Sequence, residues 1–323
     1  MRYIMSLFGC NNMSLKSILE STELILLVAI ILPIIFSIDV GVFKSSVNIL
    51  LSVIMFFSIR PFFSQKFDMR KDGKGVVTSI LLNYVLLSGV YLLLASLFFP
   101  VSSDYFKGYI LLAIIAPAVS IGPLCFLTKC DMKIADTAIF ISYLLSLIII
   151  PVASILIFGK GFDFMLLIQA LILLIVIPFI LAYFARNATW KIFDFSKVIT
   201  NFLLGGIVLI SISINRLVFL DVLNPVILKI FVINILAIFG LGLLVYFISR
   251  RFVPEMDAIA YSLYATQKNE GTGIVLALLL FSSQTVIPII IALVLQFIYF
   301  MIFKRMIIRK TVDIADDLSK VSS

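Results

Sequence analysis

The side chains best suited to chemistry lie together inside an apolar stretch. Between Ala258 and Leu280 the sequence reads AIAYSLYATQKNEGTGIVLALLL, which is long enough to cross a bilayer and carries Lys268 and Glu270 near its centre. A charge at membrane depth costs at least about 2.5–3.5 kcal/mol, so it normally faces a partner, a cavity or a substrate. The cluster predicts a substrate or ion site in a membrane transporter. Its other members are Gln267, Asn269 and Thr272.

Helix breakers accompany this cluster and recur in one earlier apolar segment. That segment reads GYILLAIIAPAVSIGPLCFLTKCD and contains Pro117, Gly122 and Pro123, while Gly271 and Gly273 follow Glu270 in the later segment. Proline removes a backbone donor and clashes with the preceding turn, which leaves carbonyls free for an ion or a substrate. We therefore expect two interrupted helices. Ordinary kinks or close-packing points are the alternative, since both residue types are common in membrane helices.

Composition restricts the class of protein. Of the 323 residues, 63% are hydrophobic and 13% charged, and the mean hydropathy is +1.22, as in a polytopic helical membrane protein. The absence of histidine removes histidine proton relays and most zinc chemistry. The cysteines, Cys10, Cys125 and Cys130, show no disulfide or metal-ligand spacing, and we expect Cys125 to be a small packing residue.

Hydropathy predicts ten spans, and the basic residues orient them. Nineteen Lys and Arg residues fall on one side of the predicted membrane and five on the other, with Lys268 inside it. The positive-inside rule then gives a multi-pass cell-membrane protein with both termini in the cytoplasm. This distribution explains the net charge of +8 without a nucleic-acid partner. The spans are roughly 20–38, 45–63, 76–99, 106–128, 134–158, 163–185, 198–220, 225–248, 257–281 and 285–303.

The ten spans divide into two groups of five. A shift of roughly 149 residues places spans 2 to 5 near spans 7 to 10 and moves Gly122 onto Gly271. Because five is odd, the second group must enter the bilayer from the opposite face. The expected architecture is an inverted repeat, with broken spans 4 and 9 meeting near the midplane, where transporters of this design bind their substrates. There we expect Lys268 and its polar neighbours to face a chamber that solvent can reach.

Three segments resemble the bile acid:sodium symporter family, part of a superfamily that includes arsenite permeases and auxin-type carriers. Residues 116–151, APAVSIGPLCFLTKCDMKIADTAIFISYLLSLIIIP, are similar to its fourth and fifth spans, including a turn with Leu127, Lys129 and Asp131. ATQKNEGTGIVLAL (265–278) resembles its broken ninth span. SILLNYVLLSG (79–89) resembles its third span, with Asn83 at the position of a polar amide ligand.

The resemblance implies one transporter domain over residues 1–323, with ten helices in two parts. Spans at about 20–63 and 163–220 would form a panel, and spans at about 76–158 and 225–303 a core. Family members move organic anions or similar solutes by alternating access, commonly with sodium. The implied partners are a small, anionic organic solute and the lipid bilayer. Ser120, beside the break in span 4, joins the candidate site, where it would either repair the backbone or touch the substrate.

The sequence departs from the family where sodium would bind. Ile121 and Gly122 stand where the family has a Ser-Asn pair, Tyr264 replaces a Glu, and Lys268 replaces a Gln. Hard cations need several oxygen ligands and an ammonium repels them, so the usual sodium sites are poorly matched. Lys268 could take the place of the ion by donating to carbonyls of the broken helices. Proton coupling through Lys268 or Glu270 and uncoupled flow remain open, and no other cofactor is expected.

Structural readings and other functions compete with this one. Lys268 could clamp Glu270 or a carbonyl, and Gln267, Asn269 and Asn83 could join helices by hydrogen bonds. A channel or a membrane ligand sensor on the same scaffold is the alternative function, although no ring of like charges indicates a pore. An enzyme is not expected, because the sequence contains no GxSxG or HExxH motif and no histidine.

Overall fold

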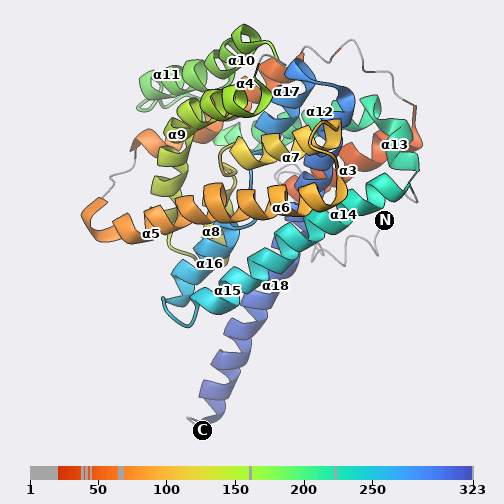
Figure 1. The fold of residues 1–323 in the computed structure, drawn as a ribbon. Helices are drawn as coiled ribbons and strands as arrows, with labels where there is room; N and C mark the ends of the chain where they lie inside the picture. Colours follow the sequence, from red (N-terminus) through yellow and green to blue (C-terminus); the bar gives the residue numbers. More distant parts are fainter. Residues whose placement is uncertain are drawn as a thin grey trace.

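The structure is a computed structural model that describes residues 21–37, 40, 43, 46–64, 69–159, 162–221 and 224–321. Regular structure in these ranges is helical, apart from one isolated β-bridge between Pro117 and Lys268 (Figure 1). The chain is thus an all-α protein with the architecture of a polytopic membrane protein. Seven helical segments in the described ranges are long and apolar enough to cross a bilayer: Ser46–Phe63, Gly73–Phe98, Met132–Phe158, Phe164–Phe184, Lys191–Ile214, Pro225–Ser249 and Ser283–Ile307.

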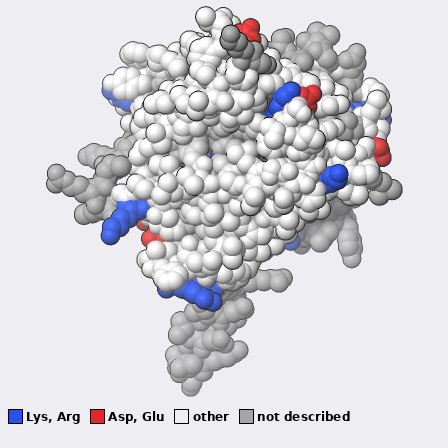
Figure 2. All heavy atoms as spheres, in the orientation of Figure 1, with Lys and Arg blue, Asp and Glu red and all other residues white. Residues whose placement is uncertain are grey.

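The outer surface of these helices is apolar. Leu97 is 69% exposed, and Leu156 and Phe184 are each 78% exposed. Few charged side chains interrupt the face drawn in Figure 2. So much exposed hydrocarbon requires lipid around it, because in water it would drive association.

One group of helices packs mainly within itself. It contains α3 (Thr22–Ile35), α4 (Ser46–Ile59), α10 (Phe164–Leu171), the π-helical turn η4 (Ile172–Val176), α11 (Ile177–Phe184) and α12 (Ser196–Ile214). Helix α12 packs on α3 and α4, and α4 also packs on η4 and α11. Close approach is possible at Gly205 of α12, where a Cβ would lie 2.7 Å from Ile25 Cγ2. The Arg60 guanidinium donates to the carbonyls of Ala185 and Ala188, which fastens the end of α4 to the end of α11.

A second group surrounds two interrupted helices. It contains α5 (Met69–Leu81), η3 (Leu82–Leu87), α6 (Ser88–Phe98), α9 (Met132–Phe158), α14 (Pro225–Ile235), η6 (Leu236–Gly240), α15 (Leu241–Ser249) and α18 (Ile287–Val321). Helix α5 packs on α9, and α14 packs on α18. Both η3 and η6 are π-helical turns inside otherwise regular spans, a feature that often marks functional sites. Neither turn was predicted from the sequence. The division of the two groups into a panel and a core that move separately stays a prediction.

The interrupted helices are the two that the sequence indicated. The first runs as α7 (Asp104–Ile114) and α8 (Ile121–Thr128), and the second as α16 (Glu255–Tyr264) and α17 (Glu270–Leu280) (Figure 1). Residues 115–120 and 265–269 between them are not helical.

The assignment of the breakers needs correction. Pro117 lies within the first interruption, but Gly122 and Gly271 are each the second residue of the half-helix that follows, and Gly273 also lies inside α17. A Cβ on Gly122 would lie 2.8 Å from Asp136 Oδ1, and one on Gly271 would lie 3.1 Å from Leu51 Cδ1. These two glycines therefore permit close packing rather than unwinding the chain. Pro123 lies in α8, and its side chain is outside the described residues.

Two predicted spans also differ in extent. The span expected at 198–220 ends at Ile214, where Asn215 caps α12 before the short helix α13 (Arg216–Leu220). The Arg216 side chain then donates to the carbonyls of Pro33 and Ile34 at the end of α3. The last span, expected to end near residue 303, continues as α18 to Val321. Boundaries shift in this way because hydropathy reports the apolar length and not the hydrogen bonds that end a helix.

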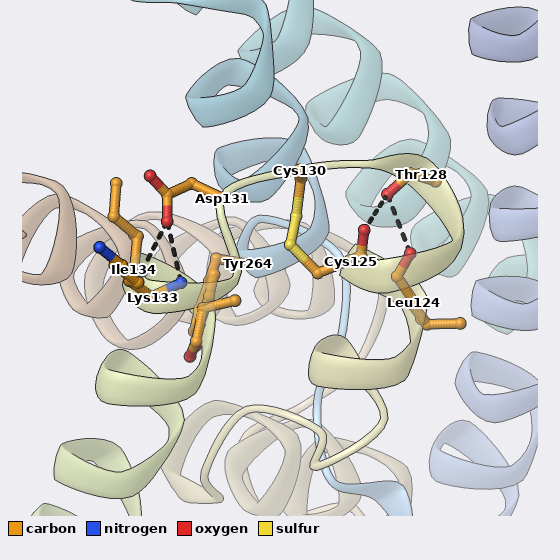
Figure 3. The surroundings of a disulfide bond; sticks show 9 residues. Leu124, Cys125, Thr128, Cys130, Asp131, Lys133, Ile134 and Tyr264 are labelled. Atoms are coloured by element: carbon orange, nitrogen blue, oxygen red, sulfur yellow. Dashed lines mark hydrogen bonds between the residues drawn. A yellow bond between two sulfur atoms is a disulfide. The ribbon is translucent and has the colours of Figure 1, made fainter. Parts of the chain in front are cut away.

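The cysteine prediction was wrong. Cys125 of α8 and Cys130 form a disulfide across the turn that joins α8 to α9 (Figure 3). The turn reverses at Lys129, which has a φ of 55°, and α9 begins after Asp131, whose carboxylate accepts from the Lys133 and Ile134 amides. The five-residue spacing gave no hint of the pairing, because only this turn brings the two sulfurs together.

Candidate functional site

The two interruptions cross and pair with each other. Ala118 N donates to Gln267 O at 3.3 Å, and Asn269 N donates to Ala116 O at 2.9 Å, which makes a short antiparallel ladder around Pro117 and Lys268. Pro117 occupies a position of this ladder at which no amide proton is needed, so its missing donor costs nothing there. The pairing satisfies backbone groups that would otherwise be unpaired and buried.

Lys268 extends from this ladder to the end of the other interrupted helix. Its Nζ lies 3.0 Å from Ser88 Oγ, 3.1 Å from Ala113 O and 3.2 Å from Ile115 O. The side chain is 0% exposed, and the Tyr84 ring centroid lies 4.9 Å from Nζ. Ala113 and Ile115 stand in the last turn and at the C-cap of α7, where carbonyls lack helical partners and the helix dipole is negative. The ammonium therefore neutralises that helix end.

Asn83 provides hydrogen-bond donors to the carbonyls at the end of α16, as Lys268 does at the end of α7. Its Nδ2 donates to Tyr264 O at 2.8 Å and to Gln267 O at 3.0 Å, the carbonyls at the end of α16 and in the unwound segment. Asn83 is 0% exposed and stands within η3. The π-helical turn also positions Ser88, whose hydroxyl contacts both Asn83 O and Ala113 O. The span formed by α5, η3 and α6, which is the predicted span 3, thus links the ends of both broken helices.

Glu270 is separated from Lys268 although only one residue lies between them in sequence. Within the described residues no ion pair joins them. Instead, Gln296 Nε2 of α18 donates to Glu270 Oε2, while Gln296 Oε1 accepts from Lys268 N at 3.3 Å. Glu270 is 2% exposed and begins α17, where a carboxylate meets the positive end of the helix dipole. Glu270 Oε1 has no hydrogen-bond partner among the described residues.

Asn269 is the cluster member that reaches the first group of helices. Its Oδ1 caps α17 by accepting from Thr272 N, and its Nδ2 donates to Tyr143 OH of α9 and lies 3.6 Å from Met55 Sδ of α4. Asn269 is half-buried, unlike its neighbours. Thr272 is 3% exposed, and its hydroxyl has no partner among the described residues.

The remaining candidates have smaller or different roles. Gln267 is 1% exposed, and its Nε2 donates to Gln296 O at 3.3 Å. Ser120 is half-buried in the first interruption, where its carbonyl accepts from Leu124 N at 2.9 Å and helps to begin α8. The structure therefore brings Asn83, Gln267, Lys268, Asn269, Glu270 and Thr272 together through α18 and span 3.

Apart from the half-buried Asn269, the cluster is closed to solvent in this conformation. We had expected Lys268 to face a chamber that solvent can reach, but its side chain is fully buried. Two hollows of the described surface have volumes of about 460 and 200 Å³. The first follows α5, η3 and α6, the second lies beside Tyr105 and Asp221, and neither is lined by Lys268 or Glu270.

Sequence reasoning missed four partners of this cluster. Gln296 had a detectable signal, since it is a polar residue in the otherwise apolar run from Val286 to Phe303. Ser88 and the two tyrosines gave no signal, because membrane spans contain such residues for many reasons. Their roles depend on contacts between residues distant in sequence. The missed partners are Ser88, Gln296, Tyr84 and Tyr143.

The groups gathered here are able to bind a solute or an ion. Among the described residues, no group of three or more His, Cys, Asp and Glu side chains could hold a metal ion. What the site offers is one ammonium, one carboxylate, several amides and the ends of four half-helices. Comparisons of the chain with models of known protein families and with curated proteins found no match. The family resemblance therefore rests on the segments quoted above.

Proposed function

We propose that this protein is a secondary transporter of a small organic anion and works by alternating access. One observation carries the proposal: two interrupted helices pair at their unwound segments and hold buried charged and amide side chains there. Discontinuous helices of this kind are the usual way in which transporters build a site inside the membrane. Interrupting two helices in lipid is costly, so it favours a functional role over a structural one.

The helix arrangement supports ten membrane crossings in two inverted repeats. Besides the seven long segments, α3 and the two interrupted pairs supply three further candidate crossings. Two correspondences support the repeat. Gly122 and Gly271 hold the same place in α8 and α17, and a buried asparagine lies in or just before a π-helical turn in spans 3 and 8 (Asn83 and Asn234). In this proposal the crossover lies near the midplane and both termini are cytoplasmic.

The transport step would be a movement between the two helix groups. Asn269 contacts Met55 and Tyr143 where α17 and α9 meet the first group. Beside this point, Phe63 and Phe179 pack against Phe140 by ring contacts at 5.7 and 5.9 Å. Ring contacts of this type are less directional than hydrogen bonds, so the two groups can slide or separate there. Separation would open the Asn269 face of the crossover to one side and then to the other.

The preference for an anion follows from the family resemblance and from one helix end. The N-terminus of α8 presents amide groups and a positive dipole end at the crossover, whereas the corresponding end of α17 is already met by the Glu270 carboxylate. Sodium coupling at the family's usual positions is not favoured, since Ile121, Gly122 and Tyr264 supply no suitable oxygen ligand there. The remaining driving forces for transport are proton coupling through Glu270 and the gradient of the solute itself.

The test is uptake into proteoliposomes that contain the purified full-length chain. Labelled pyruvate, benzoate and cholate, three organic anions of increasing apolar size, serve as probes. A transporter should show saturable uptake that is accelerated by unlabelled solute inside the vesicles. A channel would pass the probe without this acceleration, and a sensor would bind the probe without any flux. Absence of flux for all three anions, with folded protein in the vesicles, would refute organic-anion transport.

A further inference from the structure

The environment of the Lys268 ammonium is the environment of a bound monovalent cation. Two backbone carbonyls and one hydroxyl lie 3.0–3.2 Å from Nζ, which accounts for all three ammonium protons. The Tyr84 ring covers a further side. Carbonyl and hydroxyl oxygens at the negative end of an interrupted helix are the ligands from which transporters build cation sites.

Among the described residues, no carboxylate forms an ion pair with this ammonium. Glu270 is engaged by Gln296 and begins α17, so its charge is stabilised by a different helix end. The Lys268 ammonium instead donates to Ser88 of span 3 and to two carbonyls at the end of α7. Its positive charge therefore serves the carbonyls of the crossover and is not one half of a salt bridge.

We propose that Lys268 is a tethered cation: its ammonium occupies a cation site at the crossover that a free ion would otherwise have to fill. The α7 end is then neutralised without ion binding or release. The inference rests on the proposed transport function only for its flux measurement. Stability measurements test it independently.

The stability experiment replaces the tethered cation with a free one. In Lys268→Ala the alanine retains Cβ, so n-propylammonium matches the deleted atoms, and propanol is the uncharged control of similar shape. Lys268→Ala should lower the Tm of the full-length chain in detergent by about 6–20 °C, because buried carbonyls lose their only cation. Propylammonium should restore much of that loss and propanol should not. Lys229→Ala, at an exposed lysine, should show neither effect.

Two further arms keep the inference testable if Lys268→Ala fails to fold. Lys268→Gln removes the charge and adds an amide oxygen to the oxygens already present, so its Tm should rise when sodium replaces choline. The Tm of the native chain should not change in that exchange, since its site is already occupied. A native chain that sodium stabilises would overturn the proposal. The proposal would also be overturned if Lys268→Ala and Lys268→Gln both fold but no cation stabilises either. The same holds if neither variant can be obtained folded even when propylammonium is present during extraction.

The flux measurement separates this inference from the proposed function. In proteoliposomes, native uptake of a transported probe should be equal in sodium and choline buffers, and a requirement for sodium would refute the tethered cation. If none of the three anions is carried but propylammonium still rescues Lys268→Ala, the transport proposal fails and the cation site stands.

Discussion

Removing the Asn83 amide should destabilise the crossover by an amount that the structure allows us to estimate. In Asn83→Ala the Tyr264 carbonyl loses its donor at 2.8 Å, and no water can replace it because Asn83 is 0% exposed. The Gln267 carbonyl loses a donor at 3.0 Å but keeps the Ala118 amide at 3.3 Å. An unpaired buried acceptor costs about 1–3 kcal/mol, whereas an average hydrogen bond between membrane helices contributes about 0.6 kcal/mol. Asn83 Oδ1 has no described partner, so nothing further is lost there.

We expect about 1–3 kcal/mol, the estimate for one unpaired acceptor, because the chain at 265–269 has no helical ladder to satisfy Tyr264 O. Asn215→Ala is the matched control: Asn215 is also buried, but the partner of its Nδ2 among the described residues is Ser211 O of the same helix. Its loss should cost about 0.6 kcal/mol. Unfolding free energies from SDS titration in mixed micelles, followed by far-UV circular dichroism, give both values. A loss for Asn83→Ala no greater than that for Asn215→Ala would refute the role of Asn83 at the crossover.

Three other predictions use regions away from Asn83. After SDS denaturation, a maleimide-PEG reagent should label one cysteine of the native chain without reductant and three cysteines with reductant. The Cys125→Ser variant should show two labelled cysteines without reductant. Three labelled cysteines in the native chain without reductant would contradict the disulfide. Hydrogen bonds from Lys107 and Ser282 lower the pKa of Asp104 in the folded state. The ionised carboxylate therefore stabilises the fold at pH values above the pKa of Asp104 in the unfolded chain. This stabilisation is lost as the pH falls through the lower pKa of the folded state. Asp104→Asn should therefore cost about 0.5 kcal/mol at neutral pH and nothing in strong acid, measured as Tm against pH; an equal loss at both would argue against the ion pair. Gly242→Ala should lower the stability by about 1–3 kcal/mol, since the added Cβ would lie 2.6 Å from Tyr299 Oη. At Gly89 an added Cβ meets nothing within 4 Å, so Gly89→Ala should raise the stability by about 0.5–1 kcal/mol. Equal melting temperatures of the two variants would contradict the close packing at Gly242.

The all-helical membrane architecture and the two interruptions were accessible from sequence because each has a local cause. Apolar length identifies a span, and a charge inside one requires a partner. Pro117 was placed correctly because proline acts on its own backbone. The glycines were misjudged because their use here is to admit Asp136 and Leu51 from other helices, and sequence does not show which helix lies opposite.

The partners within the cluster were harder to predict for a related reason. The expectation that Lys268 could donate to freed carbonyls agrees with its contacts, but Ser88 and Ala113 could not be named, since they lie 180 and 155 residues away. The π-helical turn that positions Asn83 and Ser88 was also missed. Such a turn leaves the surrounding apolar run intact, so hydropathy does not detect it.

The contacts of Lys268 and Glu270 explain why the two charged groups of this cluster lie apart. A direct ion pair between them would place both charges on one stretch of chain and leave the carbonyls at the end of α7 without a donor. With the ammonium on α7 and the carboxylate at the start of α17, each charge neutralises a helix end of opposite sign. Gln296 joins the two by accepting from Lys268 N and donating to Glu270, so α18 is tied to the same crossover. The interrupted helices, span 3 and α18 are thereby connected by buried hydrogen bonds, whereas the first helix group meets them largely through apolar and aromatic contacts. If the two groups move relative to each other, the hydrogen-bonded crossover should therefore travel as one rigid unit.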